Sequence, residues 1–163
     1  MPLVELTTLI AAPIERCFDL ARNIDLHVSS MSSHGERAVA GVTSGLIGPD
    51  QEVTWEARHF LVRQLFTSRI TGYERPRYFQ DSMVRGAFSS FVHDHLFEAS
   101  ARGTVMKDRL SFRSPFGPLG AVVDRLVLRA YLERLLKRRN ESIKQAAEGT
   151  GRPTPRHPPP ARA

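Results

Sequence analysis

The segment from Glu36 to Phe112 is predicted to consist of one β-strand after another, joined by short turns. The strands are expected at residues 36–41, 51–59, 61–73, 78–85, 90–99 and 104–112. Most of these stretches alternate apolar and polar side chains, as a half-buried strand requires. Strands with such short links pair antiparallel, because a parallel pair needs a crossover of about a dozen residues or more. The segment therefore predicts an antiparallel meander rather than a β-α-β sheet.

Helices are expected on both sides of this meander. Before it, residues 5–11 form a first strand, Ala12-Pro13 opens a short helix, and Asn23 is placed to cap a second one. After it, a Pro- and Gly-rich break at 114–120 leads into the longest helix, over residues 118–147. The first half of this helix is apolar nearly all round. We therefore expect the sheet to clasp that half while the second half runs into solvent.

These elements predict an α+β fold. About six or seven antiparallel strands wrap on a long C-terminal helix, with two short helices after the first strand. The chain of 163 residues suffices for one core, and residues 1–147 are expected to form a single domain. Residues 148–163 are rich in Pro and Arg with almost no apolar side chain, so this tail is expected to be disordered. The chain has one cysteine, Cys17, so an internal disulfide is excluded. Cys17 is expected to be a small residue of the apolar core.

The net charge of +6 suggests a nucleic-acid-binding protein, but the basic residues are unevenly placed. Residues 137–163 carry a net charge of +5, and residues 1–136 are close to neutral. A nucleic-acid interface needs a basic face on the fold itself, so we do not expect nucleic acid as the main partner. The run Lys137-Arg138-Arg139 is expected to be a solvated helix end, with contact to RNA or to a membrane surface as the alternative.

Targeting signals are not evident in the sequence. No apolar stretch approaches the roughly 20 residues of a membrane-spanning helix. The N-terminal residues lack the basic region and apolar core of a signal peptide. A cytoplasmic protein is therefore expected, and the sequence gives no indication of its oligomeric state.

Several short motifs carry a resemblance to a known family. They are Thr54–Phe60, Phe79–Met83, Gly86–Phe88, His93–Glu98 and Pro115–Gly120. With the order of elements, they resemble the helix-grip fold of the SRPBCC superfamily, and most closely its bacterial ligand-binding SRPBCC domain branch. START lipid-transfer domains, birch-pollen-allergen-like proteins and polyketide cyclases share this architecture. The resemblance covers residues 3–147 and implies a helix-grip fold around a ligand, while cargo and chemistry differ between members.

One face of the predicted sheet combines large apolar side chains with ionisable ones. Side chains two residues apart on a strand point to the same face, so His93 and His95 share a face with two phenylalanines. The same argument on neighbouring strands gives the predicted inner face and ligand cavity: Trp55, His59, Asp81, Met83, Arg85, Phe91, His93, His95, Phe97, Met106 and Asp108. A solid core does not tolerate so many ionisable groups, so a hollow is expected between sheet and helix. The alternatives are a structural network of paired His and Asp, or a bulge that turns some of them outward.

Three functions fit these residues. The leading hypothesis is non-catalytic binding of a small or medium hydrophobic molecule with a polar end. The second is a cyclase- or dehydratase-type enzyme that uses a His–Asp acid–base pair, with His93, His95, Asp81 and Asp108 as candidates. The third is an interaction protein that uses its basic C-terminal end.

A metal site is a further possibility on the same strand. His93 and His95, with His59 or an Asp, offer the three ligands of an open zinc or iron site. The His-x-His spacing alone is a weak signal, and the resemblance implies a fold that is not usually metallated. Neither a metal nor another cofactor is therefore expected.

Overall fold

The computed structural model describes residues 2–32, 35–59, 61–115 and 117–149. The strands are β1 (Leu3–Ile10), β2 (Arg37–Gly41), β3 (Glu52–His59), β4 (Val62–Glu74), β5 (Tyr78–Arg85), β6 (Ser90–Ser100) and β7 (Gly103–Arg113). The helices are α1 (Ile14–Ala21), α2 (Ile24–Ser30), α3 (Gly117–Val123), a π-helical turn (Asp124–Leu128) and α4 (Arg129–Ala147). Of the expected tail, residues 150–163 lie outside the described residues.

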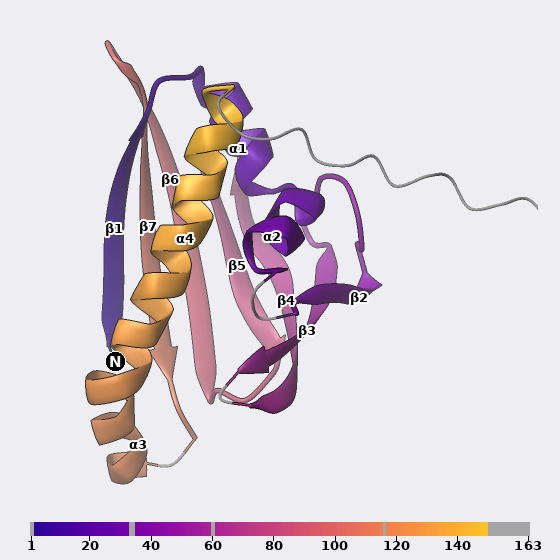
Figure 1. Cartoon of the computed structure of the whole chain (residues 1–163), viewed down its shortest axis with the longest axis vertical. Coiled ribbons are helices and arrows are strands. Elements are labelled where there is room, and N and C mark those ends of the chain that lie inside the picture. Colours follow the sequence, from indigo (N-terminus) through magenta and orange to yellow (C-terminus); the bar gives the residue numbers. More distant parts are fainter. Residues whose placement is uncertain (1, 33–34, 60, 116, 150–163) are drawn as a thin grey trace, which may run out of the picture.

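The strands form one seven-stranded sheet in the order β1-β7-β6-β5-β4-β3-β2. Every neighbouring pair is antiparallel, and among the described strands only the β1–β7 pairing joins distant parts of the chain. Helix α4 crosses one face of this sheet, with α1 and α2 beside it on the same face (Figure 1). This arrangement confirms the predicted α+β fold, including the antiparallel meander and the two short helices after the first strand.

The core divides into two apolar clusters. One surrounds Phe18 of α1, whose ring meets those of Phe79 and Phe97 edge to face at centroid distances of 5.6 and 5.4 Å. The other joins Leu110 and Phe112 of β7 to residues of β1 and α4. Along β6 and β7, the inward-facing positions between these clusters are held by polar residues. The interior of the fold is therefore polar at its centre and apolar on both sides.

The C-terminal helix differs from the prediction in which half it buries. Val122 and Leu126, in the apolar first half, are 55% and 71% exposed. The buried side chains lie further along, at Leu136, Arg139 and Ile143. The reason is the position of α3, which lies beyond the end of α4 near the rim of the sheet (Figure 1). The expectation that the sheet clasps the first half is therefore wrong for these residues, whereas Leu128 and Leu132 at the end of that half pack against the second apolar cluster.

No helix in the described part of the chain has the length and apolar character needed to cross a membrane.

Helix α2 begins at a side-chain cap, as the sequence predicts. The Asn23 side chain accepts a hydrogen bond from the backbone N–H of Leu26 at 2.9 Å. This bond satisfies one of the amide groups that the first turn of a helix leaves without a partner. The cap matters for the site described below, because α2 forms part of its wall.

Replacing the cap should weaken the protein measurably. We expect Asn23→Ala to lower the free energy of unfolding by about 1 kcal/mol in urea denaturation, because the Leu26 amide loses its acceptor. Asn23→Ser keeps an acceptor oxygen and should stay within about half that loss. Equal losses in the two variants would contradict a role for the side-chain cap.

Candidate ligand cavity

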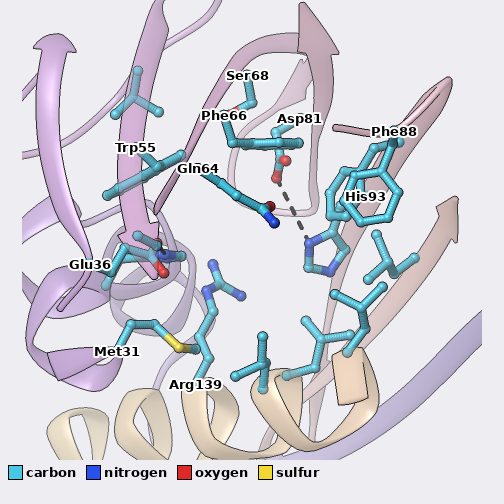
Figure 2. A pocket seen from close by; sticks show the side chains of 18 of the residues that line it. Met31, Glu36, Trp55, Gln64, Phe66, Ser68, Asp81, Phe88, His93 and Arg139 are labelled. Carbon is cyan, nitrogen blue, oxygen red and sulfur yellow. Dashed lines mark hydrogen bonds and ion pairs between the residues drawn. The ribbon is translucent and has the colours of Figure 1, made fainter. Parts of the chain in front are cut away.

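A cavity of about 350 Å³ lies between the sheet and the helices. Its walls come from the inner faces of β3 to β7, from α2, and from the π-helical turn and α4. Most lining side chains are apolar, among them Ile24, Met31, Val53, Trp55, Phe66, Ile70, Phe88, Phe91, Leu110, Leu132 and Leu136. Polar groups lie at its wall as well, and Figure 2 shows Asp81 and His93 facing Arg139 across the space.

Four polar side chains meet at the centre of the sheet's inner face. Strand register places Asp81 on β5 opposite His93 on β6, and His95 opposite Asp108 on β7. His93 Nε2 lies 3.0 Å and His95 Nδ1 2.9 Å from the same oxygen, Asp108 Oδ1. The other ring nitrogens turn toward Asp81 Oδ2, at 3.9 Å for His93 and 3.1 Å for His95. Each imidazole therefore lies between two carboxylates.

Helix α4 fixes this cluster from the opposite side. The Asn140 side chain donates to Asp108 Oδ2 at 2.6 Å. The Arg139 guanidinium lies 3.8 Å from Asp108 Oδ1 and donates to the backbone oxygen of Ala21 at 2.7 Å. Asp108 itself is fully buried. Its carboxylate thus connects two strands of the sheet to the helix that covers them.

The electrostatics of the cluster follow from burial and pairing. Burial would raise the pKa of Asp108, but its contacts with His93 and His95 hold that pKa well below the usual range. Burial also favours a raised pKa for Asp81, yet the hydrogen bond with His95 and the charge of His93 lower it. Burial and the neighbouring His95 lower the pKa of His93. Near neutral pH the cluster therefore holds two carboxylates and a neutral His93.

The predicted cavity residues fall into distinct groups. Those that line the cavity are Trp55, Asp81, Phe91 and His93. Those buried in the sheet's inner face behind or beside it are His95, Phe97, Met106 and Asp108. Met83 is half-buried and is not among the residues that line the cavity. Its sulfur atom and the ring of Phe66 both lie next to Gly86. The side chain of His59 lies outside the described part of the structure.

Arg85 leaves the predicted inner face and points to solvent. The β4–β5 register shifts so that Thr67 lies opposite Arg85 and Ser68 lies opposite Met83. One residue of β5, Val84, is therefore extra, and such a bulge breaks the alternation of faces. Arg85 is exposed, which corrects the prediction that it points into the hollow.

Sequence reasoning missed several cavity residues on the helices. Arg139 was expected to be solvated, but it is buried and projects from α4 into the cavity (Figure 2). The spacing from Leu132 through Leu136 to Arg139 and Ile143 is helical, so Arg139 occupies a position on the buried stripe. That periodicity could have identified it. His27 of α2 also lines the cavity, where its ring stacks on Trp55 at a centroid distance of 4.3 Å.

Comparison with protein families identifies the relatives of this chain. A family model described as polyketide cyclase / dehydrase and lipid transport matches residues 1–148. The chain belongs to this family. This membership agrees with a ligand-binding hydrophobic pocket, and it confirms the SRPBCC-type resemblance of the sequence. A comparison with curated proteins gave no match.

Solved structures share the fold at low sequence identity. TTHA0849 from Thermus thermophilus is 19% identical, with a TM-score of 0.69 over 90% of this chain and 99% of that one. A START superfamily protein from Mycobacterium smegmatis is 10% identical, with a TM-score of 0.68 over 91% and 99%. Ara h 8.0201 is 14% identical, with a TM-score of 0.59 over 87% and 97%. These likenesses concern the fold and confirm the helix-grip architecture.

The buried carboxylate at the centre of the cluster should be essential for stability. We expect Asp108→Ala to lower the free energy of unfolding by roughly 3–5 kcal/mol, because His93 and Asn140 lose a buried acceptor. Glu98→Ala on the outer face of β6 is the control. Its carboxylate is largely exposed and lies 3.5 Å from Lys107, so a change within about 0.5 kcal/mol is expected. If urea denaturation gives similar losses of unfolding free energy for Asp108→Ala and Glu98→Ala, the buried contacts of Asp108 do not stabilise the fold as argued.

Proposed function

We propose that this protein binds a small or medium-sized hydrophobic molecule with a polar end, without transforming it. The observation that carries the proposal is the cavity of about 350 Å³ between sheet and helices. Close-packed interiors contain few voids larger than a water molecule, so a hollow of this volume supports a ligand-binding site. It falls within the usual range of small-molecule pockets, about 300–1,000 Å³.

The character of the walls supports the chemical class of the ligand. Trp55, Phe66 and Leu132 offer apolar contact area to the body of the molecule. Asp81, His93 and Arg139 bring polar atoms to the same space (Figure 2). Such groups are costly to desolvate unless they are hydrogen-bonded, so a ligand with a polar end placed against them binds better than a pure hydrocarbon.

Filling part of the cavity should weaken ligand binding while leaving the fold intact. The probe is the amphipathic dye 8-anilinonaphthalene-1-sulfonate, whose fluorescence rises in an apolar site. Ala57 is a small lining residue on β3, and Ala57→Phe should raise the Kd of the dye at least about tenfold because the ring occupies the space.

Thr54→Phe is the matched control on the same strand. The Thr54 hydroxyl meets that of Thr67 at 2.9 Å, and Thr54 is not among the lining residues. This variant should bind the dye as the wild type does. If both variants bind equally well, the dye occupies the surface and the proposal loses its support. Native mass spectrometry of freshly purified protein would then show whether any small molecule is carried.

A second candidate function is acid–base catalysis of the cyclase or dehydratase type. The observation that favours it is His93, which lines the cavity and contacts Asp108 through Nε2. An imidazole that a carboxylate orients and that is neutral near pH 7 is suited to accept a proton next to a carbonyl group. The family description, which includes cyclases and dehydrases, agrees with this candidate.

Proton exchange tests the catalytic candidate directly. In D₂O, an enzyme of this kind should accelerate deuterium uptake at the carbon next to the carbonyl of 1-tetralone, followed by NMR. His93→Gln should reduce that acceleration about a hundredfold or more, because a general base contributes that much. If the wild-type protein does not accelerate the exchange, the non-catalytic proposal stands in preference.

A further inference from the structure

Asp81, His93 and His95 each direct one donor atom toward a common point. The three donor atoms lie within 4.8 Å of one another. Sheet register causes this convergence, since Asp81 pairs with His93 and His95 follows two residues later on the same face. Two of the three residues, Asp81 and His93, also line the cavity. The convergence point therefore borders the hollow rather than lying deep in a closed core.

Asp108 lies on the side of the two rings away from Asp81. Its Oδ1 atom lies 3.0 Å from Nε2 of His93 and 2.9 Å from Nδ1 of His95, so His93 Nδ1 and His95 Nε2 are the nitrogens on the other side of the rings. These are the two nitrogens that face Asp81. A carboxylate behind a metal-binding histidine is the usual device that holds the ring's tautomer and orientation. Here one carboxylate lies behind both histidines.

Two further contacts of Asp108 bear on the cluster. The Arg139 guanidinium lies 3.8 Å from Asp108 Oδ1. Within the described part of the chain, His95 Nδ1 makes no hydrogen bond, although it is fully buried and lies 2.9 Å from Asp108. A metal ion bound between Asp81 and the two rings would replace the hydrogen bond of 3.1 Å that His95 Nε2 makes with Asp81 Oδ2.

We propose that His93, His95 and Asp81 bind a divalent first-row transition-metal ion at the edge of the cavity. Two imidazole nitrogens and one carboxylate oxygen form the ligand set that proteins use for open Zn²⁺ and Fe²⁺ sites. Asp108 positions the His93 ring through its hydrogen bond to Nε2 and does not itself touch the ion. The spacing of His93 and His95 alone is a weak signal for a metal. The structure adds Asp81 in front of the two rings and Asp108 behind them. This inference does not depend on the identity of the hydrophobic ligand.

Cobalt titration of the full chain, first freed of metals with EDTA, tests the site. One equivalent of Co²⁺ should bind and give visible d–d absorption, and equimolar Zn²⁺ should displace it. Asp81→Asn and His95→Gln should each raise the Kd for Co²⁺ at least about tenfold, because each removes one ligand. Asp94→Asn is the control: Asp94 lies on β6 between the two histidines, but it faces the other side of the sheet and accepts from Tyr78 and Gln80.

The outcomes separate the metal site from the ligand cavity. Thermal unfolding of each variant without metal shows whether it is folded, and a rise in the wild-type Tm on adding Zn²⁺ gives a second measure that needs no variant. Failure of the wild type to bind Co²⁺, or equal affinity in Asp81→Asn and Asp94→Asn, overturns the proposal. Dye binding in the cavity tests the proposed function separately, since the dye assay contains no metal.

Discussion

A carboxylate with no exposure to water, that of Asp108, is the constraint on which the interior depends. An ion in this position is tolerated only when hydrogen bonds and opposite charge replace its lost hydration. His93, Asn140 and Arg139 provide that replacement from β6 and from α4. The position of α4 on the sheet is therefore set by polar geometry as well as by apolar packing, because the helix must present Asn140 to the carboxylate.

The polar centre also explains why the fold contains a hollow. Apolar side chains from sheet and helix would interdigitate if they met throughout the interface. Here the apolar clusters around Phe18 and around Phe112 lie on either side of the His and Asp residues. Between them, Arg139 and Asp81 face a space lined by aromatic and aliphatic side chains. Arg139 and Asp81 therefore border the cavity, where a polar group of a ligand can form hydrogen bonds with them.

The sequence-based predictions agree best with the structure for features that depend on residues close together in the chain. Alternation placed the strands and the inward faces of β6 and β7, since a two-residue period follows from strand geometry alone. The cap at Asn23 followed from its hydrogen-bonding side chain next to a helical segment. The exposure of Val122 and Leu126, early in the C-terminal helical segment, could not be inferred in this way. These apolar residues resemble those of a buried helix, and their exposure depends on where the sheet ends.

The sequence by itself determined the order of elements, the antiparallel pairing and the face on which His93 and His95 lie. These depend on periods and link lengths that a single chain contains. Only the tertiary structure decided that Arg85 leaves that face, because the bulge at Val84 arises from pairing with β4. It likewise decided that Arg139 enters the cavity and that both histidines share one carboxylate. Such contacts join residues far apart in sequence, and their distances are fixed only when sheet and helix pack together.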